Sequence, residues 1–208
     1  MPTELFAQAL VTLFVTIDPI GMAPVFLAVT RGMTSEQRRQ TAIRAVIVAG
    51  AVLVVFAVVG QRLLDFFGIT MPAFRIAGGL LLFAIAFEMV FERRERRKAE
   101  SVERALTHED VGHLAVFPLA IPLIAGPGAI SATILLAARA PDALVVGEIA
   151  LVAAVLVASC LVVFLAAGRI ERLLGDTGRI VLTRLLGVIL AALAVQYVAD
   201  GILAFARG

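Results

Sequence analysis

Two short polar interruptions stand in otherwise apolar stretches of the 208-residue chain. The first is Asp-Pro-Ile-Gly at Asp18–Gly21, and the second is Gly-Pro-Gly at Gly126–Gly128. Proline removes a backbone N–H and obstructs the preceding helical turn, and the residue before proline avoids helical geometry. Both stretches therefore predict broken helices, in which freed carbonyl and amide groups can face a polar solute.

The chemistry of these residue types suits a zwitterion. A carboxylate matches the positive N-terminal end of a half-helix, with unpaired amides at Gly21, or at Gly128 and Ala129. An ammonium group matches Asp18, or the freed carbonyls beside the two breaks. The candidate substrate-binding residues are Thr16, Asp18, Pro19, Gly21, Gly126, Pro127, Gly128, Ser131 and Thr133.

Asp18 carries most of this hypothesis. An aspartate at the centre of a membrane helix costs about 2.5–3.5 kcal/mol on insertion scales, so such residues mark functional sites. Asp18 could also act as N-cap of the half-helix that begins at Pro19, and the two roles are compatible. The hydroxyls of Thr16, Ser131 and Thr133 have a competing role as well, because they can bond to their own helix backbone.

Other polar residues lie within the apolar segments. Arg75 and Arg184 could form gating ion pairs with Glu88 or Asp200, or they could extend to the membrane surface. Gln196 could line a cavity. The candidates for gating or for the cavity wall are thus Arg75, Arg184, Glu88 and Gln196.

The elements that must position these residues are membrane-spanning helices. Hydrophobic residues make up 61% of the chain and the mean hydropathy is +1.02, whereas soluble domains contain about 45–50% apolar residues. A membrane helix needs about 20 apolar residues. The sequence predicts an all-α integral membrane protein with six transmembrane helices, at about 4–30, 41–67, 72–91, 113–138, 143–167 and 180–205.

The distribution of basic residues predicts the orientation. Fourteen of the 18 Lys and Arg residues fall in or beside the loops after the first, third and fifth spans. The positive-inside rule places these loops in the cytoplasm and both termini outside, as expected for a bacterial-type inner membrane. The longest of them, 93–112, is expected to anchor the topology or contact lipid headgroups. His108, Glu109, Asp110 and His113 fit no strong zinc pattern, so no metal is expected.

The two halves of the chain resemble each other at two points. Pro19-Ile20-Gly21 aligns with Pro127-Gly128-Ala129, and Arg75-x-x-Gly78 aligns with Arg184-x-x-Gly187. We expect one membrane domain built from three-helix units at 1–92 and 113–208. Because each unit has an odd number of spans, the second enters from the opposite face, and an inverted 3+3 repeat with breaks in helices 1 and 4 follows.

The segments DPIGMAPVFLAVT and PLAIPLIAGPGAISATILL resemble the signature segments of the MarC family of six-span inner-membrane proteins. The resemblance covers essentially the whole chain. It implies transport of small neutral amino acids such as glycine and alanine. The family pattern often has Asn where this chain has Met22, which removes a polar side chain beside the first break.

The sequence leaves several points open. The chain could export other small metabolites, or it could be a scaffold or regulator that transports nothing. No catalytic motif indicates an enzyme, no cofactor is expected beyond a coupling H⁺ or Na⁺, and nucleic acid is not an expected partner. Oligomeric state is not predicted. Asp18→Ala and Gly128→Leu are expected to abolish uptake and leave folding intact.

Overall fold

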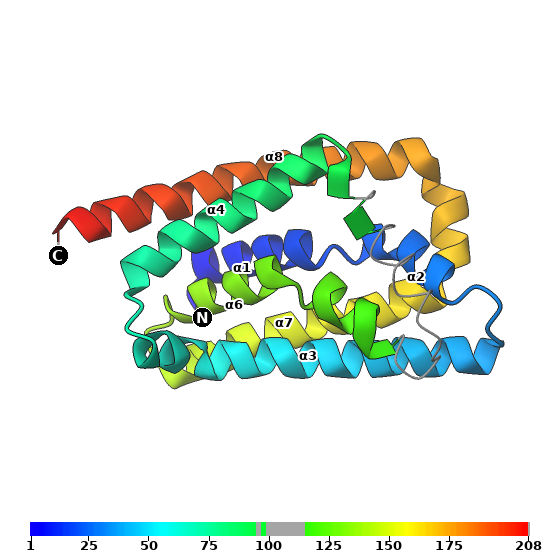
Figure 1. The fold of residues 1–208 in the computed structure, drawn as a ribbon, viewed down its shortest axis with the longest axis horizontal. Coiled ribbons are helices and arrows are strands. Elements are labelled where there is room, and N and C mark those ends of the chain that lie inside the picture. The colour runs from blue at the N-terminus through cyan, green and yellow to red at the C-terminus, as the bar shows by residue number, and fades with distance from the viewer. Residues whose placement is uncertain (95–96, 99–114, 208) are drawn as a thin grey trace.

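The computed structural model describes residues 1–94, 97–98 and 115–207. Every regular element within these ranges is helical, and the helices lie side by side as a bundle (Figure 1). The elements are α1 (Thr3–Ile17), η1 (Ile20–Met22), α2 (Ala23–Val29), α3 (Ser35–Phe66), α4 (Met71–Val90), η2 (Ala115–Ile124), α6 (Pro127–Ala137), α7 (Ala143–Leu165) and α8 (Ala167–Arg207).

Five segments of the described chain are long and apolar enough to cross a membrane. They match the first, second, third, fifth and sixth expected spans. The fourth expected span is not among them, because its described part consists of a wide-turn helix, η2, and the 11-residue helix α6. The five segments are Thr3–Val29, Ser35–Phe66, Met71–Val90, Ala143–Leu165 and Thr177–Arg207.

Side-chain caps fix where several helices begin. The Thr34 hydroxyl accepts from the Gln37 amide while the Gln37 side chain accepts from the Thr34 amide, a reciprocal capping box. This cap explains why α3 begins at Ser35, six residues before the start expected from hydropathy. Thr70 and Asp142 cap α4 and α7 with a single bond each, in which the side chain accepts from the amide three residues on.

The last helix changes direction near its start. Gly175 has φ 60° and ψ 177°, so the backbone leaves helical geometry there and the chain from Thr177 forms the membrane-length part. A positive φ of this size is strained for residues with a side chain, which explains glycine at this bend. In Figure 1, α8 runs along α4 after the bend.

Glycines bring α4 and α8 together. A Cβ built on Gly79 would lie 2.8 Å from the Ala194 carbonyl oxygen, and one on Gly187 would lie 2.9 Å from the Met89 Cβ. These distances are too short for larger residues, and small residues let membrane helices approach closely. Gly78 has a similar role against α6, because a Cβ built on it would lie 2.8 Å from Leu135 Cδ1.

Replacing Gly187 by leucine is expected to push α4 and α8 apart, because the new side chain would meet backbone and Cβ atoms that cannot rotate away. Overpacking of this kind typically costs about 1–3 kcal/mol. Thermal unfolding of the purified protein measures the loss. Gly147→Leu is the matched control, since a Cβ at Gly147 meets nothing within 4 Å. An equal effect of both variants would show that the contact is not responsible.

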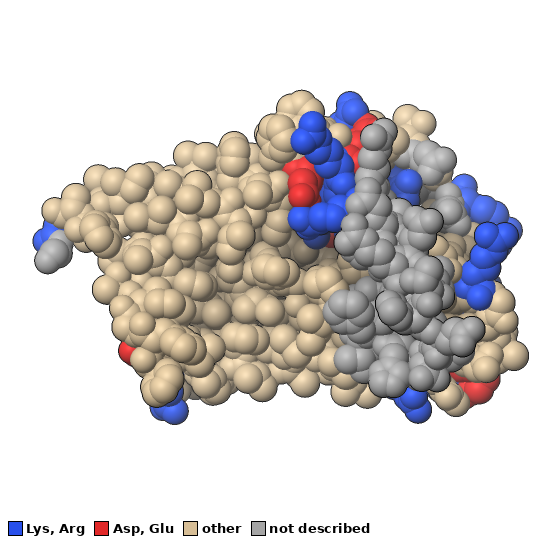
Figure 2. All heavy atoms as spheres, in the orientation of Figure 1, with Lys and Arg blue, Asp and Glu red and all other residues tan. Residues whose placement is uncertain are grey.

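Charged side chains gather at one end of the bundle. Figure 2 shows most of the visible Lys and Arg at the end that carries the chain after α4, while a broad surface between the two ends is almost free of charge. Exposed large apolar side chains occupy the long helices, including Ile47, Val55, Leu151 and Val162. An uncharged apolar belt with charge at its rim is what a bilayer requires.

Candidate functional site

The first helix breaks where the sequence predicts. α1 ends at Ile17, and Asp18 adopts a left-handed conformation with φ 55°. Pro19 has no amide hydrogen, so the carbonyl of Val15 loses its normal partner four residues on. Arg94 supplies the missing donors, because its guanidinium donates to the carbonyls of Val15 at 3.4 Å and of Thr16 at 2.7 Å.

The Asp18 carboxylate is buried and fully engaged. The side chain is 5% exposed, and its Oδ1 accepts from the Gly21 amide at 3.1 Å. Its Oδ2 lies 2.8 Å from Lys98 Nζ and 4.0 Å from Arg94 Nε. The N-cap position of η1 is held by Pro19, so Asp18 precedes the capping position that the sequence suggested for it. Its carboxylate still accepts from the Gly21 amide, which is therefore not unpaired.

The second break presents a helix N-terminus. Gly126 is the N-cap of α6, with extended backbone, and no side chain of the described residues caps the helix. The first intrahelical bond runs from the Ile130 amide to the Gly126 carbonyl at 3.0 Å. The preceding amides of Gly128 and Ala129 therefore have no acceptor within the helix. This end of α6 carries the positive pole of the helix dipole.

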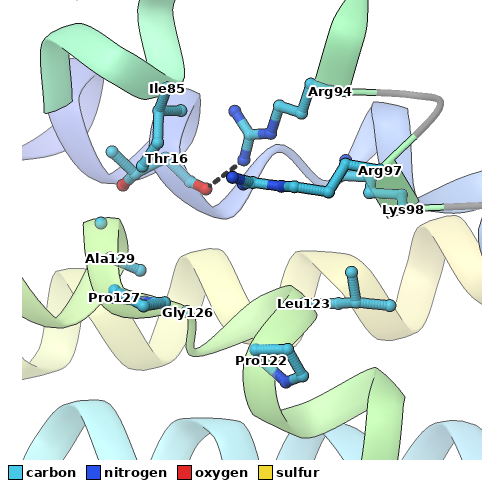
Figure 3. A pocket seen from close by; sticks show the side chains of 11 residues that line it. Thr16, Ile85, Arg94, Arg97, Lys98, Pro122, Leu123, Gly126, Pro127 and Ala129 are labelled. Atoms are coloured by element: carbon cyan, nitrogen blue, oxygen red, sulfur yellow. Dashed lines mark hydrogen bonds between the residues drawn. The ribbon is translucent and has the colours of Figure 1, made fainter. Parts of the chain in front are cut away.

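A cavity of about 270 Å³ lies between the two breaks. Figure 3 shows Thr16 and Ile85 on one side, Gly126, Pro127 and Ala129 on the facing side, and the side chains of Arg94, Arg97 and Lys98 entering from the segment after α4. We call it the central cavity. Its lining is Thr16, Ile85, Arg94, Arg97, Lys98, Pro122, Leu123, Gly126, Pro127, Gly128 and Ala129.

The electrostatics of the central cavity favour an anionic group. Three cationic side chains line it. Within the described part of the chain, Asp18 pairs with Arg94 and Lys98, and Glu88 pairs with Arg97. The positive end of α6 lies on the opposite wall. Guanidinium, ammonium and backbone amides are the groups with which proteins bind carboxylates and phosphates. The cavity can therefore bind a small solute through the carboxylate of that solute.

The expected site residues divide into three groups. Thr16, Gly126, Pro127 and Gly128 line the central cavity. Asp18 lies behind the cations that line it. The remaining residues, Pro19, Gly21, Ser131 and Thr133, are not part of the lining.

The hydroxyl groups follow the competing role that the sequence left open. Thr16 Oγ1 donates to the carbonyl of Thr12 at 2.8 Å, and Thr133 Oγ1 donates to the carbonyl of Ala129 at 2.7 Å. Both bonds lie within a helix, so these hydroxyls satisfy their own backbone. Each hydroxyl has then used its one hydrogen, so it can contact a solute only as a hydrogen-bond acceptor.

The expected gating residues form different pairs from those anticipated. Arg184 forms an ion pair with Glu92, and Glu88 pairs with Arg97 at 2.8 Å. Gln196 is exposed and donates to Asp200 at 2.7 Å, so it does not line the central cavity. Arg75 lies at the other end of the bundle, in a second cavity that Asp200 also lines.

Arg94 and Lys98 are the residues that sequence reasoning missed. Both belong to a stretch interpreted as a topology anchor, yet they are only 5% and 3% exposed. Two signals point to them in retrospect. A buried aspartate in a membrane helix requires a cationic partner, and positions 94 and 98 have the spacing that puts two side chains on one helical face.

The expected absence of a metal stays a prediction. The four residues that prompted the question, His108, Glu109, Asp110 and His113, lie outside the described residues, as does most of the loop 93–112.

Comparison with known proteins places the chain among integral membrane proteins of one family. The family described as "MarC family integral membrane protein" matches residues 3–206. A "UPF0056 membrane protein" of Archaeoglobus fulgidus is 38% identical, covering 95% of this chain and 92% of the relative. UPF0056 membrane protein YhcE of Escherichia coli is 34% identical, covering 91% and 88%. No solved structure matches the chain.

Proposed function

Because the chain belongs to the MarC family of integral membrane proteins, we propose that it is a secondary transporter of small neutral amino acids. Glycine and alanine are the expected solutes, and the central cavity is their binding site. The observation that supports this proposal is the placement of the cavity between two broken helices. Broken helices that meet around a polar cavity are how many secondary transporters hold solutes inside the bilayer.

The solute carboxylate binds first in this scheme. The amides of Gly128 and Ala129 point from the N-terminus of α6, and Arg94 stands across the cavity. A carboxylate between them gains charge-assisted hydrogen bonds from both walls. Binding of the carboxylate also leaves Asp18 where it is, held by its hydrogen bond to Gly21 and its ion pair with Lys98.

The solute ammonium then replaces Lys98 at Asp18. The Lys98 ammonium lies 2.8 Å from Asp18 Oδ2, which is the position an amino-acid ammonium would take. Exchange of one ammonium for another keeps the buried carboxylate compensated throughout. We propose that this exchange links solute binding to movement of the segment after α4. We also propose that Asp18 carries the coupling proton or helps hold Na⁺, and of the two we prefer the proton.

The dimensions of the cavity limit the side chain of the solute. About 270 Å³ lies below the range of about 300–1,000 Å³ that is typical of pockets for drug-sized ligands. Ile85, Leu123 and Pro122 supply the apolar part of the wall. A solute with a hydrogen or methyl side chain suits this space, which supports glycine and alanine over larger amino acids.

The finer architecture belongs to the same proposal. Six spans in an inverted 3+3 repeat, with both termini outside an inner membrane, would bring the two breaks together from opposite faces. The facing positions of Thr16 and Gly126 across the central cavity support this arrangement. Neither catalysis nor a cofactor is part of the scheme.

Flux through proteoliposomes tests the proposal. Purified protein should take up or release radiolabelled glycine and alanine in response to a proton or Na⁺ gradient, and both solutes should raise its unfolding temperature. Leucine and phenylalanine should do neither. Flux of another small carboxylate, without flux of either amino acid, would favour the metabolite exporter. The absence of any flux or stabilisation would favour the scaffold.

A further inference from the structure

A second cavity, of about 390 Å³, lies at the end of the bundle opposite the segment after α4. Its walls come from the beginning of α4, the turn after α6 and the last turns of α8. The sequence predicts that this end faces outward, and we call the space the outer cavity. Its lining is Arg75, Arg139, Tyr197, Asp200, Leu203, Ala204 and Arg207.

The outer cavity concentrates positive charge where the chain has little. The positive-inside pattern leaves four Lys or Arg residues on this side, and three of them, Arg75, Arg139 and Arg207, line the cavity. Asp200 is the only carboxylate among the lining residues that the structure describes, and it accepts a hydrogen bond from Gln196. Such a local excess of positive charge attracts anions.

Tyr197 gives the cavity a buried donor. The residue is 3% exposed, and its hydroxyl makes no hydrogen bond of normal geometry within the described part of the chain. Arg139 and Thr12 are its close polar neighbours, and Arg75 also acts on it electrostatically. A buried hydroxyl normally has a partner. An oxyanion in the cavity would supply an acceptor for the hydroxyl and for the guanidinium groups together.

We propose that the outer cavity binds one oxyanion, a carboxylate or a phosphate. Arg75 and Arg139 provide the charge, and Tyr197 donates the directional hydrogen bond. Guanidinium groups suit both anions because they offer paired donors in a plane. A free solute or a lipid headgroup could carry the group. The proposal does not depend on the transport function.

The position of the outer cavity relates it to the central cavity. Thr12 lies beside Tyr197, and Thr16, one turn further along α1, lines the central cavity. The Thr16 hydroxyl donates to the Thr12 carbonyl at 2.8 Å, so the two residues lie in one continuous helix. A single helix thus extends from one cationic cavity to the other.

The composition of the chain supplies a probe for this site. Tyr197 is the only tyrosine and the chain has no tryptophan, so tyrosine fluorescence reports on the outer cavity alone. Purified full-length protein in detergent is titrated with acetate and with inorganic phosphate, against chloride at equal ionic strength. We expect a saturable change with at least one oxyanion and none with chloride.

Variants test which residues bind. Arg75→Gln and Arg139→Gln should weaken the affinity about tenfold or more, since hydrogen bonds to charged groups contribute about one such factor each. Arg62→Gln removes a charge from the same side but outside the cavity, and should change nothing. Calorimetry of Tyr197→Phe should show weaker binding with little loss of thermal stability, because the hydroxyl makes no hydrogen bond of normal geometry with the residues that the structure describes.

The source of the anion is resolved in nanodiscs. Phosphatidylcholine discs are compared with discs that contain phosphatidylglycerol. A response to the anionic lipid alone assigns the site to a headgroup, and a response to acetate or phosphate in detergent assigns it to a free solute. Absence of saturable binding by fluorescence and calorimetry in every condition, or an equal loss in Arg62→Gln, overturns the proposal.

Discussion

Asp18→Ala will destabilise the protein as well as abolish transport. The substitution leaves Lys98 and Arg94 buried without the carboxylate that both now contact. Removal of one partner of a buried ion pair typically costs about 3–5 kcal/mol. Thermal unfolding of the purified variant measures the loss. Sequence reasoning alone expected this variant to fold normally, and the buried pair is the reason that we now expect otherwise.

A double variant separates stability from transport. Asp18→Asn with Lys98→Gln removes the closest ion pair of the cluster and should recover most of the lost stability, because replacing a whole buried pair is often close to neutral. Arg94 keeps its hydrogen bonds to the carbonyls of Val15 and Thr16 in this variant. Transport should stay absent, since no carboxylate remains for the solute ammonium. Asp65→Ala, at an exposed carboxylate, is the control and should unfold like the parent. If Asp18→Ala unfolds at the parent temperature, the pair does not stabilise the fold.

Gly128→Leu will block transport with a much smaller effect on folding. A Cβ at this position would already overlap Ile85 Cδ1, the flexible end of a side chain that can turn aside. The rest of a leucine side chain would occupy the central cavity and cover the amides at the start of α6. Flux should fall to the background of empty liposomes, while stability falls by no more than about 1–3 kcal/mol.

Two further variants, one smaller at the same position and one of equal size elsewhere, serve as controls for this prediction. Gly128→Ala requires only a small shift of Ile85 and should retain part of the flux, whereas Gly147→Leu, in open space on α7, should leave flux unchanged. Parental flux in Gly128→Leu would remove the central cavity from the solute path, even if the protein still transports.

Local chemistry made the helix breaks predictable from sequence. Pro19 and Pro127 remove amides, and the backbone departs from helical geometry at Asp18 and Gly126, the residues before them. The long apolar runs in the same way predict six spans, and five of them are helices of membrane length in the described part of the chain. Each of these features depends on a few neighbouring residues, so a single sequence is enough to locate them.

The partners of Asp18 depend instead on distant parts of the chain. Lys98 lies 80 positions from Asp18, and five other basic residues stand in the same stretch. Hydropathy treats all of them as water-facing, since a local average cannot detect that two of them fold back into the bundle. The expected pairing of Arg184 with Glu88 or Asp200 failed for the same reason, because its partner Glu92 is set by how α8 lies against the segment that follows α4.

The long sequence separation within the Asp18–Lys98 pair has a consequence for biosynthesis. The aspartate enters the membrane long before the ribosome has made the lysine, so the nascent first helix carries an uncompensated charge until α3 and α4 have followed. A fragment that ends at residue 92 lacks both cations that contact Asp18. If residues 1–92 form a three-helix unit, as the sequence predicts, the insertion of that unit is completed only by the chain that comes after it.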